Sequence, residues 1–220
     1  MVLRVQKKGR LTKQDIEEKI ANAGDYVKID HLTRFLQEPL EQDVRRFALL
    51  TLAGLYSSKL MFPEAGKLMR LAGDLQVTFK EKIDSYVKSG ELFMKANLFS
   101  ESDNSFVKAL ECGNNKEKEE IKNIRKTLYF SLAKEYLSRN KRGNASQVYE
   151  KILTLDLSPE ELIEAKKTLL VLYEQLGKIR EFSMLQRSID SAELQKKQHQ
   201  EAIETQKQKY SPSVDELIGL

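Results

Sequence analysis

The chain has 220 residues, of which 40% are hydrophobic and 32% are charged, and it contains only four prolines and ten glycines. This composition is typical of long exposed helices and argues against a sheet-rich fold. The 37 lysines and arginines outnumber the 33 aspartates and glutamates, but five of the basic residues precede Asp15, the first acidic one. The rest of the chain is therefore nearly neutral, which argues against an extended nucleic-acid-binding face.

The cysteine and hydrophobic content narrows the class of protein further. Cys112 is the only cysteine, so neither an intrachain disulfide nor a multi-cysteine zinc site can form. The N-terminus lacks the apolar region of a signal peptide, and the longest nearly apolar run, residues 47–56, has about half the length of a membrane span. We therefore expect a cytoplasmic protein without a membrane span.

Residues 1–38 are predicted to form a basic arm and two short capping helices. The five early positive charges lie within residues 4–13, and Thr12 with Asp15 gives a start signal for the first helix. The arm is interpreted as a solvated terminus, with weak contact to phosphate groups as the alternative. Five apolar residues of the two helices are expected to face inward: Ile16, Ile20, Leu32, Phe35 and Leu36.

The region from about residue 40 to residue 185 is predicted to be helical throughout. Its apolar residues recur at spacings of three and four, without sustained alternation, and short polar or Gly/Pro-containing breaks indicate about ten helices in the chain. The clearest helix start is Ser158, which is followed by Pro159 and by Glu161 at the capping-box position. The predicted fold class is therefore all-α.

An internal repeat organises this region. A large aromatic residue recurs at Tyr56, Phe93, Tyr136 and Tyr173. Mostly small residues lie three positions before it (Ala53, Gly90, Ala133, Leu170) and nine after it (Ala65, Ser102, Ala145, Phe182), and mostly bulky ones thirteen after it (Met69, Phe106, Tyr149, Gln186). Small residues let two helices approach closely and bulky ones fill the space between neighbouring helix pairs, so such pairs are buried only by stacking.

This pattern resembles the tetratricopeptide repeat. The resemblance covers roughly residues 39–190 and implies a right-handed solenoid of about four helix hairpins, at approximately 39–76, 77–113, 116–157 and 158–190. The last hairpin departs from the pattern at Phe182 and Gln186, as expected of a terminal capping repeat. The repeats are longer than usual, and the longest spacing contains the charged run at residues 116–122. No subfamily is assigned.

The resemblance implies a ligand groove along the concave face, which the first helix of each hairpin lines. The matching positions include Val87, Glu91, Met94, Lys95, Phe130, Lys134, Leu137 and Val171. Met94 and Leu137 each directly follow an aromatic residue of the repeat, and both are expected to be exposed; core packing is the alternative for each position. The clamp with which chaperone-binding members hold a carboxylate is missing at the matching positions, so the expected ligand is a peptide or an amphipathic helix.

The sequence contains no pattern typical of a catalytic or cofactor site. It has neither a G-x-G-x-x-G nor a P-loop motif, and His31 and His199 lie far apart without ligand-type neighbours. Cys112 is interpreted as a structural residue, because no base is near it in sequence. We therefore predict a non-enzymatic protein without cofactor or metal, acting as an adaptor, scaffold or assembly factor. The alternative is a nucleic-acid-associated helical protein that uses the basic arm.

Residues 191–220 are predicted to form a polar helical extension and an apolar tail. A seam from residue 185 to residue 210 is only partly apolar, which favours a solvated helix over a weak coiled coil that would make a homo-oligomer. The tail carries Val214, Leu217, Ile218 and Leu220 and is predicted to be a docking motif. Packing of the tail against the fourth hairpin is the alternative.

Overall fold

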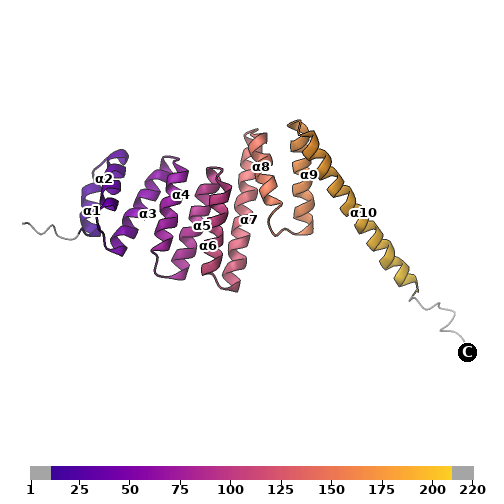
Figure 1. Cartoon of the computed structure of the whole chain (residues 1–220), viewed down its shortest axis with the longest axis horizontal. Coiled ribbons are helices and arrows are strands. Elements are labelled where there is room, and N and C mark those ends of the chain that lie inside the picture. The colour runs from indigo at the N-terminus through magenta and orange to yellow at the C-terminus, as the bar shows by residue number, and fades with distance from the viewer. Residues whose placement is uncertain (1–10, 210–220) are drawn as a thin grey trace, which may run out of the picture. The chain divides into compact units, whose positions relative to one another are not determined.

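The computed structural model describes the backbone of residues 11–209 and the side chains of residues 11–191 and 201–205, and the regular structure in this part of the chain is all helical (Figure 1). The all-α prediction is confirmed for these residues. The helices are α1 (Lys13–Ile20), α2 (Asp25–Gln37), α3 (Gln42–Ser58), α4 (Phe62–Asp74), α5 (Phe79–Lys95), α6 (Phe99–Cys112), α7 (Asn115–Ser138), α8 (Arg142–Ile152), α9 (Pro159–Gln175) and α10 (Ile179–Lys209). None of these helices is apolar over the length needed to cross a membrane.

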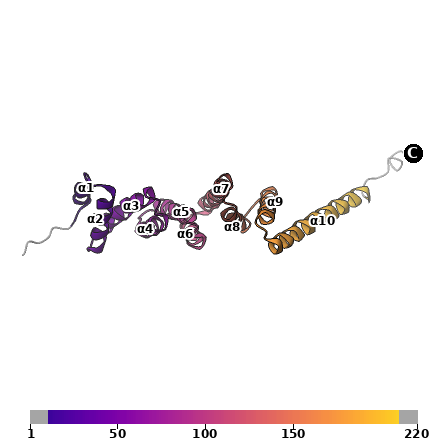
Figure 2. The ribbon, with the colours of Figure 1, turned by 90° about the horizontal axis from the view of Figure 1, so that it is seen from above.

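The chain divides into two compact units, Met1–Leu128 and Tyr129–Leu220, with the boundary inside α7. In the first unit α2 packs against α3, α3 against α4, α4 against α5 and α5 against α6, and in the second unit α8 packs against α9 and α9 against α10. Figure 2 views the helices of the first unit nearly end-on and shows α3 and α5 in one row and α4 and α6 in the other. We call α3, α5, α7 and α9 the A helices and the helix that follows each of them a B helix.

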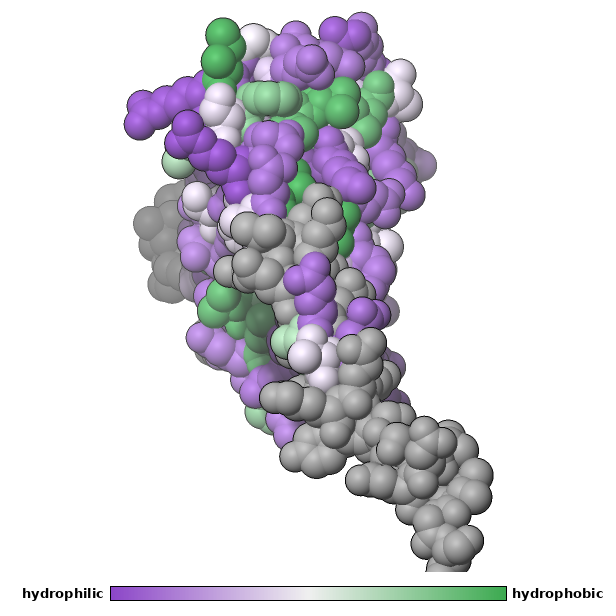
Figure 3. Space-filling model, turned by 90° about the vertical axis from the view of Figure 1, so that its right-hand side faces the viewer, coloured by the Kyte–Doolittle hydropathy of each residue, from purple (hydrophilic) through white to green (hydrophobic). Residues whose placement is uncertain are grey.

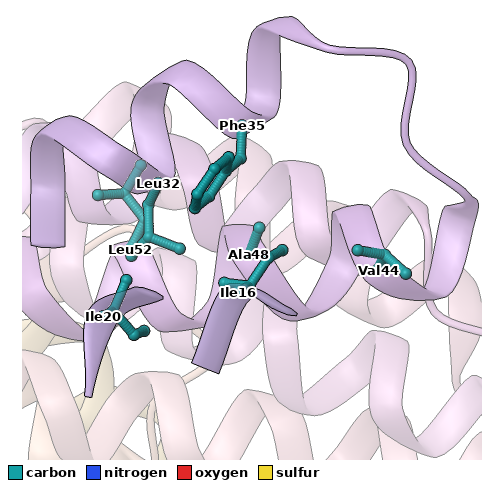
Figure 4. Packing of buried hydrophobic residues seen from close by; sticks show 7 residues of the cluster. All are labelled: Ile16, Ile20, Leu32, Phe35, Val44, Ala48 and Leu52. Atoms are coloured by element: carbon teal, nitrogen blue, oxygen red, sulfur yellow. The ribbon is translucent and has the colours of Figure 1, made fainter. Parts of the chain in front are cut away.

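The two N-terminal helices form a hydrophobic cluster together with α3. A capping box between Thr12 and Asp15 starts α1, as the sequence predicts. The inward residues that were predicted for α1 and α2 are buried, apart from Leu36, which is half-buried against the same core. Figure 4 shows their packing against α3, with the labelled residues Ile16, Ile20, Leu32, Phe35, Val44, Ala48 and Leu52.

Four turns of the same geometry join the A helices to the B helices. One residue in each turn has a left-handed backbone: Leu60, Asn97, Asn140 and Gly177, with φ between 53° and 67°. Each of them lies four positions after the aromatic residue of the repeat. Left-handed geometry at this point ends a helix and directs the chain back along it.

The hydrogen bonds of the four turns are also the same. In each turn the N–H that follows the left-handed residue donates to the carbonyl of the repeat's aromatic residue: Met61 to Tyr56 at 2.9 Å, Leu98 to Phe93 at 2.9 Å, Lys141 to Tyr136 at 2.8 Å and Lys178 to Tyr173 at 2.9 Å. The residue that donates this bond then accepts, with its own carbonyl, the first helical hydrogen bond of the B helix. The donors of that second bond are the N–H groups of residues 65, 102, 145 and 182. The left-handed residue and the turn hydrogen bond therefore recur at the same positions relative to the aromatic residue in all four repeats.

Close helix contacts in the first unit depend on small residues. A Cβ atom at Gly90 of α5 would lie 2.7 Å from the ring of Phe106 in α6, and one at Gly66 of α4 would lie 3.1 Å from the ring of Phe93 in α5. Ser89 donates to the carbonyl of Gly66 at 2.8 Å and lies 3.1 Å from Ser105. Ser89 and Ser105 are therefore satisfied where α4, α5 and α6 pack at close range, whereas the buried hydroxyl of Ser102 in α6 has no hydrogen-bond partner.

Helix α7 accounts for the longest spacing between repeats. It has 24 residues, whereas α3, α5 and α9 have 17 each. Asn114 and Glu117 exchange hydrogen bonds of 2.8 and 3.0 Å at its start, and Ile121 in the added length is buried. The charged run at residues 116–122 is therefore two extra helical turns that join the core through one apolar residue.

The second unit comprises the end of α7 together with α8, α9 and α10. Ser158 and Glu161 form the predicted capping box at the start of α9. Tyr149 and Ile152 of α8 and Leu169 of α9 are buried. Helix α10 packs against α9 near its start, and the described side chains of residues 201–205 are exposed. The predicted helical extension is thus present up to residue 209.

Candidate functional site

The groove residues of the second hairpin lie on α5, in the first unit. Val87 and Glu91 are half-buried and Lys95 is exposed. Glu91 accepts from Lys88 at 2.8 Å and from Lys95 at 2.7 Å. Burial raises the pKa of Glu91, but the two lysines outweigh that effect and leave its pKa below the usual value. Glu91 thus pairs with two lysines, and these three side chains together carry one net positive charge.

Met94 corrects one of the sequence predictions. It was expected to be exposed, but only 2% of its surface is accessible. Helix α5 has helices packed against it on two sides, α4 and α6, so that its buried face is wider than the stripe of a surface helix. Met94 is a core residue of the first unit and offers no surface to a partner.

The other four predicted groove residues lie in the second unit. Leu137 of α7 is 37% exposed and Val171 of α9 is 49% exposed, although both are apolar. Lys134 is exposed, and Phe130 is half-buried. The expectation that Leu137 is accessible is therefore confirmed. The four α5 residues belong to the first unit and these four to the second.

The tail residues Val214, Leu217, Ile218 and Leu220 lie outside the described residues, as does most of the basic arm. On the face drawn in Figure 3, hydrophobic residues form small groups between hydrophilic ones. Among the residues that the structure describes, no group of three or more His, Cys, Asp or Glu side chains is placed to hold a metal ion.

The first unit also contains a pocket that the repeat pattern did not predict. The pocket has a volume of about 400 Å³, and its wall is mostly apolar. It is lined by Leu36 of α2, Arg45 and Leu49 of α3, and Leu68, Leu71, Asp74 and Leu75 at α4. The signal in the sequence was the leucine stripe at positions 68, 71 and 75, which follows helical spacing on a B helix.

Two arginines fix the backbone around this pocket. Arg45 donates to the carbonyl of Leu36 at 2.8 Å, and Arg46 donates to the carbonyl of Leu75 at 3.2 Å. Both carbonyls belong to helix C-termini, where a positive charge is favourable. The pocket therefore lies at the end of the first unit where α2 and α4 finish and α3 begins.

Asp74 forms a polar edge of the pocket. It accepts hydrogen bonds from Tyr86 and Lys108, both at 2.7 Å. Burial raises the pKa of Asp74, but these two hydrogen bonds and the charge of Lys108 outweigh it and hold its pKa below the usual value. Burial and the bond to Asp74 raise the pKa of Tyr86. Asp74 is thus an ionised group that joins α4, α5 and α6.

Comparison with known proteins adds no assignment. No family model matches the sequence, and a search of curated proteins finds no significant match.

Proposed function

We propose that this chain is a tetratricopeptide-like helical repeat protein that acts as a non-enzymatic interaction module. In this proposal its A helices bind a peptide or an amphipathic helix of mixed apolar and charged character. The four identical turns, each four residues after a repeat aromatic, support a hairpin repeat. The right-handed solenoid and the adaptor role are part of the proposal.

The observation that carries the proposal is the exposure of Val171 and Leu137 on A helices of the second unit. Both are apolar and lie at positions where the resemblance puts ligand contacts, and 49% and 37% of their surfaces are accessible. Exposed charged residues flank them along the same helices, such as Lys134 and Glu174. An amphipathic helix that packs apolar side chains between charged ones fits such a surface.

A pull-down of the full chain from native lysate, with and without nuclease, tests this function. We expect Leu137→Glu with Val171→Glu to lose a defined set of captured proteins, because two buried charges would face the ligand. The matched control is Ile179→Glu with Met184→Glu, which places the same charges at 77% and 64% exposed positions of the same unit. The control is expected to retain the set.

The melting temperatures of both double variants should stay close to that of the unaltered chain, since all four positions are substantially exposed. If both variants capture the same proteins as the unaltered chain, the assigned surface is wrong. If the captured set disappears on nuclease treatment, the chain is associated with nucleic acid and the alternative function applies.

A further inference from the structure

The leucine-lined pocket lies next to the start of the described chain. Lys13, at the beginning of α1, forms an ion pair of 3.1 Å with Asp43, in the first turn of α3. Arg45, which lines the pocket, follows two residues later. The N-terminal arm therefore meets the folded part of the molecule at the same end of the first unit as the pocket.

The position of Leu11 shows where the arm joins the folded part of the first unit. Its side chain packs against the core of α1, α2 and α3, and so do Leu36 and Leu68. Leu36 and Leu68 also line the pocket. Leu11 and two residues of the pocket wall thus pack against the same hydrophobic cluster.

Residues 1–10 have both the length and the composition to occupy the pocket. Ten extended residues span up to about 33 Å, more than the length of α3, which at 17 residues is about 25 Å. Three aliphatic residues, Val2, Leu3 and Val5, lie at the far end of the arm, and Lys7, Lys8 and Arg10 lie between them and Leu11.

The charge of the arm matches that of the loop beside the pocket. Residues 38–41 contain two exposed carboxylates, Glu38 and Glu41, and a third, Asp43, lies in the first turn of α3, where it pairs with Lys13. The arm carries four positive side chains within residues 4–10 and no acidic one. Opposite charges that are partly shielded from water attract each other, and salt weakens that attraction.

We propose that the pocket binds the chain's own N-terminal segment. Val2, Leu3 and Val5 enter the leucine-lined cavity, and the basic residues of the arm lie along residues 38–43. Docking covers Leu71, which is 51% exposed in the described part of the structure. The pocket then becomes a site for a basic and apolar peptide segment, and a partner with such a segment has to displace the arm. This inference is independent of the proposed function of the A helices.

Paramagnetic relaxation in the full chain tests the proposal. A nitroxide is attached at Gln6→Cys, with Cys112→Ser so that no other thiol is present, and the leucine methyl groups are labelled with carbon-13. We expect the methyl signals of Leu36 and Leu71 to lose intensity. Leu98 serves as the reference, because it lies in the turn between α5 and α6, at the other end of the unit's helices. Raising the salt concentration should restore part of the intensity.

Two sets of variants show whether the pocket is responsible. Leu71→Glu should restore the Leu36 signal, whereas Val107→Glu, at a position of similar exposure on α6, should not. Replacing Val2, Leu3 and Val5 by serine leaves the pocket unaltered and should weaken the attenuation of both signals, so the outcome does not depend on the fold of the Leu71 variant.

Equal attenuation at Leu98, Leu36 and Leu71, or attenuation of Leu71 that is as strong in the serine variant as in the unaltered arm, would overturn the proposal. A mixture of nitroxide-bearing chain and separately isotope-labelled chain should show no attenuation. Attenuation in that mixture would place the arm of a second copy in the pocket and would refute docking within one chain.

Discussion

The ring of Phe106 occupies the space that a side chain at Gly90 would need. A Cβ atom at Gly90 would lie 2.7 Å from this ring, which is fully buried between the helices. We predict that Gly90→Ala lowers the free energy of unfolding by about 1–3 kcal/mol through overpacking, despite the higher helix propensity of alanine. Denaturant unfolding followed by circular dichroism measures the change.

Gly54 of α3 provides the matched control. It is also inside an A helix, but a Cβ atom there would have no neighbour within 4 Å. Gly54→Ala should therefore raise the free energy of unfolding by about 0.5–1 kcal/mol, because alanine loses less backbone entropy on folding. If both substitutions raise the free energy of unfolding, helix propensity rather than packing decides and the close contact is wrong.

Phe106 itself should contribute strongly to stability. Its side chain is fully buried and its ring lies 5.8 Å from the guanidinium of Arg125. We predict that Phe106→Ala costs about 3–5 kcal/mol as a large-to-small core substitution. Lys116→Ala, at an 88% exposed side chain of α7, should cost less than about 0.5 kcal/mol. Similar melting temperatures for the two variants would contradict the core assignment.

Leu60 is an unfavourable residue for its turn. It has a left-handed backbone and is 72% exposed, whereas the equivalent positions hold Asn97, Asn140 and Gly177. Leu60→Asn should raise the free energy of unfolding by about 1 kcal/mol, because asparagine tolerates this geometry and little apolar contact is lost. Asn97→Leu should have the opposite effect. Thermal unfolding of both variants measures the pair, and a loss of stability in Leu60→Asn would show that Leu60 makes contacts that offset the strain.

The lowered pKa of Asp74 should make the stability of the fold depend on pH. Because its pKa in the folded chain is below the usual value of 3.8, its charge contributes stability above that value, and the contribution is lost as the pH falls through the lowered pKa. Asp74→Asn retains an acceptor for Tyr86 but removes the charge opposite Lys108. The variant should therefore melt below the unaltered chain at about pH 7, and the difference should shrink below about pH 4. A difference that stays constant with pH would show that the charge of Asp74 contributes nothing.

The local features of the fold were predictable from the sequence. Capping boxes at Thr12 and Ser158 and the register of Tyr56 and Phe93 depend on residues within one helix or one hairpin, and spacing alone reveals them. The prediction that Ile16 and Leu32 face inward succeeded for the same reason, since helical periodicity separates an apolar face from a polar one.

Features that depend on several helices were not predictable in this way. Whether Met94 is exposed depends on how much of α5 its two neighbours cover, which its spacing from Phe93 does not encode. The pocket arises where α2, α3 and α4 leave Leu71 incompletely covered, and a leucine stripe has the same sequence whether its face is closed or open. The left-handed geometry of Leu60 was also hidden, because leucine is not a residue that signals such a turn.

Helix α10 runs without interruption from Ile179 to Lys209. Its length therefore determines how far residue 209 lies from the start of the helix and toward which side of the helix axis it faces. Each residue inserted after the α9 contact would move residue 209 about 1.5 Å outward and rotate it by about 100° around the helix axis. Inserting seven residues would add about 10 Å while nearly restoring the original direction. A variant with one added residue changes mainly the direction in which residue 209 faces, whereas a variant with seven changes mainly its distance. Comparing the two would show which of these a function of the C-terminal residues depends on.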